Sequence, residues 1–137
     1  MPKPKTPLLT VDAIIVMPGD KLVLIKRKNP PYQGQYALPG GFVDIGETTE
    51  DACKREALEE TNVNVKIVKL TGVYSDPKRD PRGHTVSIAY LCKPASKKEK
   101  PKAQDDAADL DLIPLKDVES LKLAFDHKKI IKDSHII

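Results

Sequence analysis

The chain has 137 residues, of which 39% are hydrophobic and 31% charged, as is typical of one soluble globular domain with a single core. Its formal net charge of +3 is too small to indicate a nucleic-acid-binding surface. Cys53 and Cys92 are too few for a disulfide framework or a zinc pattern, and no apolar run of about 18 residues predicts a membrane span. We therefore expect a single-domain cytoplasmic protein that binds neither nucleic acid nor membranes.

The first part of the chain carries strand and turn patterns. β-Branched and aliphatic residues predict a strand over 8–17, and Pro18-Gly19-Asp20 predicts a turn into its hairpin partner, 21–27. Proline and glycine content makes 28–35 a loop. A further short strand is predicted just before Gly46, from Phe42, Val43 and Ile45.

The stretch from Thr48 to Asn62 predicts the main helix. Thr48 offers a hydroxyl for the N-cap, and Asp51 follows three residues later in the capping-box pattern. Glu50 and Asp51 fall in the first turn, where the helix dipole favours acidic side chains. Asn62 tolerates the left-handed conformation that often ends a helix. We therefore expect a helix over 49–61.

Strands return after this helix, and the chain closes on a second helix. Alternating apolar residues predict a half-buried strand over 63–74. Strands on both sides of one helix, followed by a terminal helix, predict an α/β fold in which helices cover a mixed sheet. The remaining expected elements are loops over 75–83 and 95–104, strands over 84–91 and 109–115, a short helical turn over 117–121 and a helix over 126–136.

Glu56, Glu59 and Glu60 have the i, i+3, i+4 spacing that places side chains on one helical face. The small apolar residues on or beside that face are Ala52, Cys53 and Ala57. The acidic face should therefore pack against the fold, where crowded carboxylates lose hydration and repel one another. Mg²⁺ or Mn²⁺ would relieve that repulsion, because both prefer clustered oxygen ligands. For an isolated acidic triplet, the alternative is a solvated charged face.

A longer pattern surrounds these acids, beginning at the glycine pair Gly40-Gly41. It resembles the signature of the Nudix hydrolases, G-x5-E-x7-R-E-U-x-E-E-x-G-U, in which U is apolar. The fixed positions are occupied by Gly41, Glu47, Arg55-Glu56-Ala57, Glu59-Glu60 and Val63. Only the last glycine differs: it is Asn62, and its expected role is conformational.

This resemblance implies a Nudix-type α/β/α sandwich with a mixed sheet, formed by residues 1–137 as one domain. It implies Mg²⁺-dependent cleavage of a nucleoside diphosphate linked to another group, with Mn²⁺ as a substitute metal. The implied catalytic residues and metal ligands are Glu56, Glu59 and Glu60, with a backbone carbonyl of Gly40 or Gly41 as a further ligand. Glu47 and Arg55 are implied to pair and to brace the loop against the helix.

Several other stretches resemble the ADP-ribose pyrophosphatase subgroup of this family. They are ALPGGFVDIGE with the preceding PPYQGQY, YSDPKRDPRGHTVSIAYL, and LAFDHKKI near the end of the chain. In that subgroup a proline lies about fifteen residues beyond the signature, and here Pro77 lies fourteen residues beyond Val63. Arginine and lysine side chains suit phosphate recognition. The expected substrate-binding residues are Arg27, Pro77, Lys78, Arg79 and Arg82, although a solvated charged loop is the alternative for the last three.

Many Nudix enzymes draw a further acid from a late loop, as a metal ligand or a base. The candidates here are Asp105, Asp106 and Asp109, each of which could equally be a loop acid or a cap. For the lone histidines His84 and His127, surface or structural roles are expected. Tyr32, Tyr36 and Phe125 could stack on a base, and core packing is equally plausible for them.

The resemblance leads to a Mg²⁺-dependent hydrolase that converts ADP-ribose to AMP and ribose 5-phosphate, with a glutamate of the signature, Glu56 or Glu60, as base. Two alternatives remain. The first is a nucleoside triphosphate pyrophosphatase of the type that removes 8-oxo-dGTP. The second is a non-catalytic ADP-ribose sensor, which the intact signature acids disfavour. Related enzymes are often homodimers, and we expect a small-molecule nucleoside diphosphate as the substrate.

Overall fold

The computed structural model describes residues 2–137, which form a mixed seven-stranded sheet with helices on both faces. Hydrogen-bonded neighbours run in the order β3-β2-β1-β6-β5, with β4 also paired to β1 and β7 to β2. Strand β1 runs parallel to β6 and antiparallel to β2 and β4. The strands are β1 Leu8–Met17, β2 Lys21–Arg27, β3 Tyr36–Ala37, β4 Gly40–Phe42, β5 Val65–Tyr74, β6 Thr85–Pro94 and β7 Ala107–Pro114.

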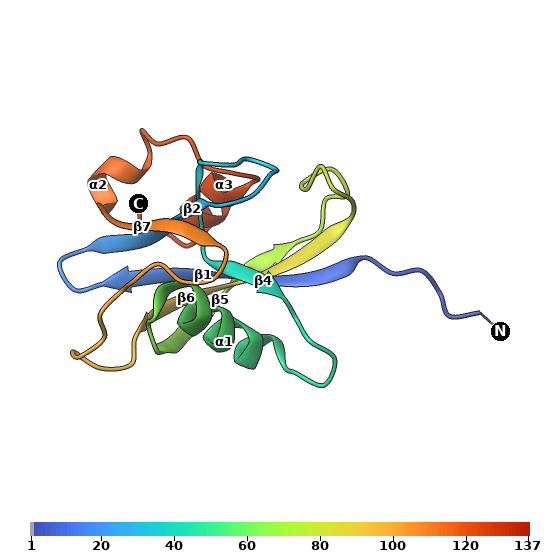
Figure 1. Ribbon diagram of the computed structural model, residues 1–137, viewed down its shortest axis with the longest axis horizontal. Coiled ribbons are helices and arrows are strands. Elements are labelled where there is room, and N and C mark those ends of the chain that lie inside the picture. The colour runs from blue at the N-terminus through green and yellow to red at the C-terminus, as the bar shows by residue number, and fades with distance from the viewer. Residues whose placement is uncertain (1) are drawn as a thin grey trace.

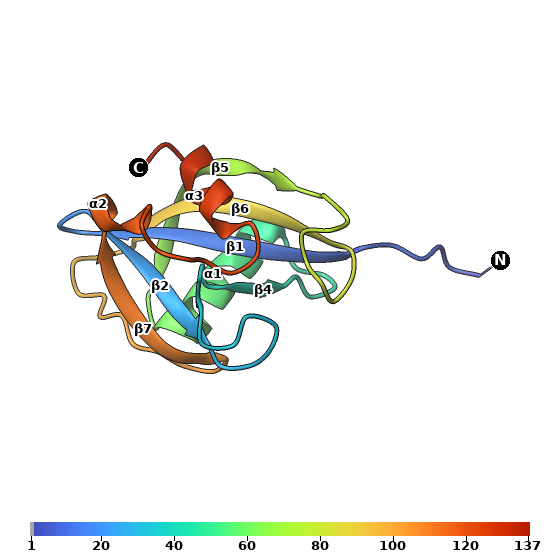
Figure 2. The same ribbon diagram turned by 90° about the horizontal axis from the view of Figure 1, so that it is seen from above.

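The helices lie in two layers on either side of the sheet. Helix α1, Thr49–Thr61, covers one face, whereas α2, Leu115–Val118, and α3, His127–Asp133, lie on the other side of β1 (Figure 1). Seen from above, β1 crosses the middle of the molecule between β2 and β6 (Figure 2). This arrangement confirms the expected α/β/α sandwich with a mixed sheet. No described helix is long and apolar enough to cross a membrane.

Alternating side chains of β1 contribute to a hydrophobic cluster on each side of the sheet, because successive residues of a strand point to opposite faces. Val11, Ala13 and Ile15 pack with the small residues of α1. Ile14 packs on the opposite side, where it meets Ile130 of α3. Asp12, on the same side as Ile14, is a buried acid in this otherwise apolar layer.

Helix α1 has the boundaries that the sequence predicts. The Thr48 hydroxyl accepts a hydrogen bond from the Asp51 backbone N–H at 3.1 Å. At the other end, Asn62 is left-handed, with φ of 61°, and its N–H donates to the carbonyl of Leu58. Asparagine therefore serves where the Nudix signature has glycine, because it is among the few residues with a side chain that enter this conformation readily.

One strand of the fold differs from expectation. The short strand before Gly46 is β4, Gly40–Phe42, rather than a strand formed by Phe42, Val43 and Ile45, and Ile45 is fully exposed. The glycine pair lies so close to β1 that a Cβ on residue 40 would come within 2.1 Å of the Val11 carbonyl oxygen. Only a glycine can make this approach, and the apolar pattern of the sequence does not reveal it.

The lysine-rich loop 95–104, expected to be solvated, is fastened to the C-terminal end of α1. The backbone N–H groups of Lys102 and Gln104 donate to the carbonyls of Thr61 and Glu60, at 2.7 and 3.0 Å. The loop thus satisfies carbonyls that have no partner within the helix. As a result, the turn at Asp105 and Asp106 lies beside the acidic face of α1.

Candidate active site

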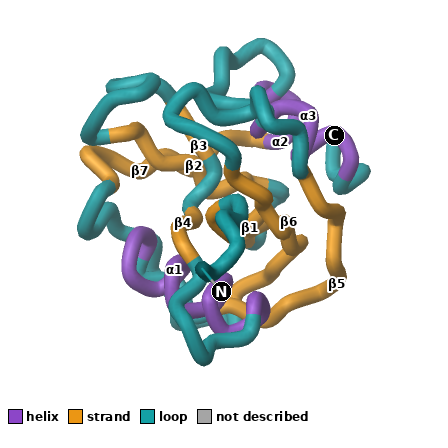
Figure 3. Tube along the Cα trace, turned by 90° about the vertical axis from the view of Figure 1, so that its right-hand side faces the viewer, coloured by secondary structure: helices purple, strands orange, loops and turns teal. Residues whose placement is uncertain are grey.

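A cleft of about 420 Å³ opens where β1 and β4 meet the acidic face of α1. Its other walls come from the loop after β2, the loop between β5 and β6, and the segment that leads into α3. Helices α1 and α3 lie on opposite sides of β1, so the cleft draws residues from both layers (Figure 3). Of the site residues predicted from the sequence, those that line the cleft are Gly40, Gly41, Glu56, Glu60, Arg27, Arg79, Arg82 and Asp106.

Glu60 is a buried carboxyl group in the wall of the cleft. Its side chain is almost inaccessible, and its Oε2 atom has no hydrogen-bond partner among the described residues. Burial, and then the nearby charge of Glu56, raise the pKa of Glu60 to about 9, although the backbone N–H of Gly40 opposes the shift. Burial likewise raises the pKa of Glu56. Two carboxyl groups with little hydration and a shortage of hydrogen-bond donors form a site that favours an added cation.

The glycine pair packs directly against these acids. A Cβ on residue 41 would lie 2.6 Å from the carboxyl carbon of Glu56, and one on residue 40 would lie 2.8 Å from Oδ1 of Asp12. The backbone of β4 therefore runs between the α1 carboxylates and the β1 strand with no space for a side chain.

Glu59 does not share the cleft with Glu56 and Glu60. It is the most exposed of the three, and Arg55 Nη1 donates to its Oε2 at 3.2 Å. The expectation that all three acids pack against the fold is therefore wrong for Glu59. At about 100° per residue, the triplet spans an arc wide enough for one end to reach solvent.

Arg55 joins the loop before α1 to the helix. Its Nε and Nη2 atoms bind the two carboxylate oxygens of Glu47 at 2.7 and 2.9 Å, and Nη2 also donates to the carbonyl of Phe42 at 2.9 Å. Hydrogen bonds from Arg55, and then from the backbone of Asp44, lower the pKa of Glu47 to about 2. A further hydrogen bond from Arg55 Nη1 to Glu56 Oε1, at 2.8 Å, orients one of the acids in the cleft.

The raised pKa of Glu60 makes the stability of the metal-free protein dependent on pH. The unfolded chain ionises this group near 4.5, whereas the folded chain keeps its proton until about pH 9. The unfolded state therefore binds fewer protons across that range, and the free energy of unfolding must fall as the pH rises. We expect this fall between about pH 5 and 9 in chemical denaturation with EDTA present, and a clearly flatter profile for Glu60→Gln. Parallel profiles for the two proteins would contradict a buried, protonated Glu60.

Arginine side chains line the cleft together with the acids. The guanidinium carbons of Arg27 and Arg82 lie 5.0 and 5.6 Å from the centre of the Phe125 ring. Arg82 is held by the buried Asp80, through bonds of 3.1 and 2.8 Å from Nε and Nη2. Burial, and then the charge of Arg82, lower the pKa of Arg27, which shows that two like charges face the same space. Phe125 also makes an edge contact with Tyr32, at 4.9 Å between ring centres.

Arg79 connects the loop between β5 and β6 to the segment before α3, and its guanidinium group is not free to bind phosphate. Its side chain is 5% exposed, and its Nε and Nη2 bind both oxygens of Asp126 at 2.9 and 2.7 Å. A third bond, of 2.9 Å, runs from Nη1 to the hydroxyl of Thr85. The sequence marks Arg79 as a cation in a flexible loop, but its partner lies 47 residues away in the segment before α3.

Other predicted site residues lie outside the cleft. Pro77 does not line the cleft, and Lys78 faces a separate hollow between β5 and α3. Asp105 occupies a left-handed turn, and Asp109 lies on β7, where its Oδ1 accepts a hydrogen bond from the backbone N–H of Leu110. Only Asp106 of the three late acids reaches the cleft, because the loop before it is fastened to α1.

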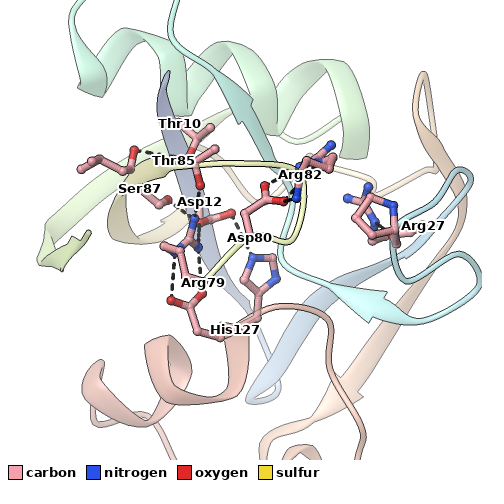
Figure 4. A network of polar contacts seen from close by, with 12 residues as sticks. Thr10, Asp12, Arg27, Arg79, Asp80, Arg82, Thr85, Ser87 and His127 are labelled. Atoms are coloured by element: carbon pink, nitrogen blue, oxygen red, sulfur yellow. Dashed lines mark hydrogen bonds and ion pairs between the residues drawn. The ribbon is translucent and has the colours of Figure 1, made fainter. Parts of the chain in front are cut away.

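Sequence reasoning missed a buried polar cluster in the wall of the cleft, shown in Figure 4. Asp12 lies at its centre and accepts a hydrogen bond from the Ser87 hydroxyl at 2.5 Å. His127 Nε2 and Arg79 Nη2 lie 3.4 and 3.9 Å from the Asp12 carboxylate oxygens. The sequence indicates this cluster only through Asp12, an acid among the apolar residues of β1. Burying an unpaired charge costs free energy, so a buried Asp12 needs polar partners.

The cleft has the kind of donors that suit a hard divalent cation. The unpartnered buried oxygen of Glu60, the adjacent Glu56 and the close glycine backbone provide oxygen atoms without side-chain obstruction. Within residues 2–137, no three His, Cys, Asp or Glu side chains converge as a complete ligand set. This incomplete set fits Mg²⁺, which retains several waters and uses only one or two carboxylates, better than it fits a metal that needs a full protein cage.

The chain belongs to the NUDIX domain family, whose family model matches residues 6–134. One relative is an ADP-ribose pyrophosphatase of Methanocaldococcus jannaschii, which is 50% identical over 127 residues, covering 93% of this chain and 72% of the relative. Another is the ADPR responsive transcriptional repressor NtrR of Acinetobacter baylyi, which is 33% identical over 94% of this chain. The chain spans about half of that repressor, or 53% of its length.

A solved structure supports the same placement. The NUDIX domain of Shewanella oneidensis NrtR, crystallised in complex with ADP ribose, matches with a TM-score of 0.85 and 32% sequence identity. The match covers 96% of this chain and 88% of that domain.

Proposed function

We propose that this protein is a Mg²⁺-dependent pyrophosphohydrolase that cleaves ADP-ribose to AMP and ribose 5-phosphate. Its reaction class is hydrolysis of a pyrophosphate bond. The observation that carries the proposal is that one cleft is lined by the acids Glu56 and Glu60 and by the cationic side chains of Arg27 and Arg82. A diphosphate in this cleft would meet both guanidinium groups and the metal-binding acids.

The charges lining the cleft support a need for added cations. Six carboxyl groups and four cationic side chains line it, so an anionic substrate would be repelled without further positive charge. Mg²⁺ would be held by Glu56, Glu60 and a backbone carbonyl of Gly40 or Gly41. When bound, Mg²⁺ offsets the charge of a diphosphate and makes a neighbouring water more acidic.

The side chains of the cleft would bind the phosphates, accept a proton and hold Glu56 in place. Arg27 and Arg82 would bind the phosphate oxygens and offset the charge that develops as the bridging P–O bond breaks. Glu56 or Glu60 would accept the proton of the attacking water. The oxygen of that water joins one phosphorus and the bridging oxygen leaves with the other phosphate, so each product carries one phosphate. Arg55 would hold Glu56 in place through the contact at 2.8 Å.

The cleft also favours a diphosphate over a triphosphate. Asp80 and Asp106 line the cleft beside the arginines, so a third phosphate would approach further carboxylates. A neutral sugar avoids that repulsion. The relatives with ADP-ribose in their names or titles, an enzyme and a repressor, agree with this preference for the ligand. Intact Glu56 and Glu60 distinguish the enzyme proposal from the sensor alternative.

A substrate panel tests the proposal. We expect kcat/KM for ADP-ribose to exceed that for dGTP, 8-oxo-dGTP and NADH by about tenfold or more, equivalent to roughly 1.4 kcal/mol of transition-state preference. The assay uses equal substrate concentrations with Mg²⁺, and chromatography identifies the products as AMP and ribose 5-phosphate. EDTA should abolish the activity, and Mg²⁺ or Mn²⁺ should restore it.

Two outcomes of the panel would contradict parts of the proposal. Hydrolysis of 8-oxo-dGTP about ten times faster than ADP-ribose would replace the substrate assignment while keeping the reaction class. Tight ADP-ribose binding in calorimetry, with no products after prolonged incubation with Mg²⁺, would instead support the sensor alternative.

A further inference from the structure

His127 occupies the junction between α3 and the glycine segment that packs on the catalytic acids (Figure 4). It is the first residue of α3 and is 4% exposed. Its Nδ1 accepts a hydrogen bond from the backbone N–H of Leu38 at 2.9 Å. Because Nδ1 is the acceptor, the proton of the neutral ring is on Nε2. Burial lowers the pKa of His127, which keeps the ring in this neutral form.

The other ring nitrogen faces Asp12. His127 Nε2 lies 3.4 Å from Oδ1 of this carboxylate, while the Ser87 hydroxyl donates to Oδ2 at 2.5 Å. Arg79 lies 3.9 Å away and neutralises the buried charge. The ring therefore lies between the Leu38 amide, which donates to Nδ1, and the Asp12 carboxylate, which faces Nε2.

The segment from Leu38 to Gly41 connects the histidine to the acids. The Leu38 amide is held by His127, and the Pro39 carbonyl accepts a hydrogen bond from the Ala13 N–H at 2.8 Å. Gly40 pairs with Asp12 across β1 and β4, and the Gly41 Cα faces the Glu56 carboxylate. The backbone from Leu38 to Gly41 is thus packed between the buried polar cluster and the acids of α1.

We propose that His127 is a positioning residue for hydrolysis, whose Nδ1 holds the backbone from Leu38 to Gly41 in register with Glu56 and Glu60. The inference rests on the proposed metal-dependent function of those acids. His127 also lines the cleft, but it is only 4% exposed, so it would act through the glycine backbone and not through the substrate. Losing the acceptor should therefore weaken metal binding and lower kcat, with little change in KM.

Two substitutions separate the contacts of the ring. In His127→Asn the side-chain oxygen lies near the place of Nδ1 and can still accept from Leu38. In His127→Gln the terminal amide lies near the place of Nε2, so the contact to Asp12 is kept and the acceptor for Leu38 is lost. The pair thus differs in the one hydrogen bond that the proposal invokes.

Mn²⁺ binding followed by electron paramagnetic resonance, together with steady-state kinetics on ADP-ribose, gives the two readouts. We expect His127→Gln to raise the Kd for Mn²⁺ and to lower kcat by about tenfold or more each, the usual effect of losing a group that orients a metal site. Its KM should stay within about threefold of wild type, and His127→Asn should stay within about threefold in every constant. Equal losses in both variants, no loss in His127→Gln, or a rise in KM alone would overturn the proposal.

A measurement on the wild-type protein keeps the test independent of how the variants fold. Nitrogen NMR should show an unprotonated Nδ1 in His127 and a scalar coupling across its hydrogen bond to the Leu38 amide. A protonated Nδ1 would overturn the inference. Wild-type protein that binds no Mn²⁺ would overturn the proposed metal site, and with it this role of His127. Normal Mn²⁺ binding by both wild type and His127→Gln would overturn the inference alone.

Discussion

Glu60→Gln should lower kcat for pyrophosphate hydrolysis by a factor of about 10² or more, equivalent to roughly 2.7 kcal/mol of transition-state stabilisation. Glu60 is almost completely buried in the wall of the cleft, and its Oε2 has no hydrogen-bond partner among the described residues. Glutamine has nearly the same shape but offers no negative charge to a cation. The variant should fold normally, because it removes a carboxyl group that burial and Glu56 disfavour in the charged form.

Glu59→Gln is the matched control. Glu59 lies in the same helix but is exposed and paired with Arg55, so we expect its kcat to stay within about fivefold of wild type. The measurement is kcat at saturating Mg²⁺, with circular dichroism to verify folding of both variants. A larger loss in Glu59→Gln than in Glu60→Gln would show that the outward-facing acid is the metal ligand.

Gly41→Ala should lower kcat by about 10², because an error of about 1 Å in the position of a catalytic group has an effect of that size. The added Cβ would lie 2.6 Å from the Glu56 carboxyl carbon, and the carboxylate must move away. The colliding atoms are the far end of a flexible side chain, so the fold should survive. Activity assays and thermal melting together distinguish this loss from unfolding.

Alanine substitutions at two other glycines serve as comparisons for Gly41→Ala. Gly40→Ala would place its Cβ 2.1 Å from the Val11 carbonyl oxygen, a backbone atom that no rotamer change can move, and we expect this variant to fold poorly. Gly72→Ala, on β5 and outside the cleft, meets only the Tyr74 side chain at 3.2 Å and should retain wild-type kcat. Wild-type activity in Gly41→Ala would show that Glu56 does not need its observed position.

The sequence by itself determined most of the elements and the chemical class of the site. β-Branched residues predict β1, alternating apolar residues predict β5, and Thr48 and Asn62 mark both ends of α1, because strand patterns and helix capping depend on neighbouring residues. The spacing of Gly41, Glu47, Arg55 and the three glutamates also lies within one short stretch. Such local patterns can be read without knowing the fold.

Only the tertiary structure decided which charged residues face the cleft. Helical spacing groups Glu56, Glu59 and Glu60, but what covers each one depends on β4 and on the loop 95–104. Arg79 is a loop cation in the sequence and a buried partner of Asp126 in the fold. Asp12 and His127 come together across more than a hundred residues, and burial raises or lowers a pKa only once distant segments have packed around the group. Burial and pairing are properties of these long-range contacts, which no local pattern contains.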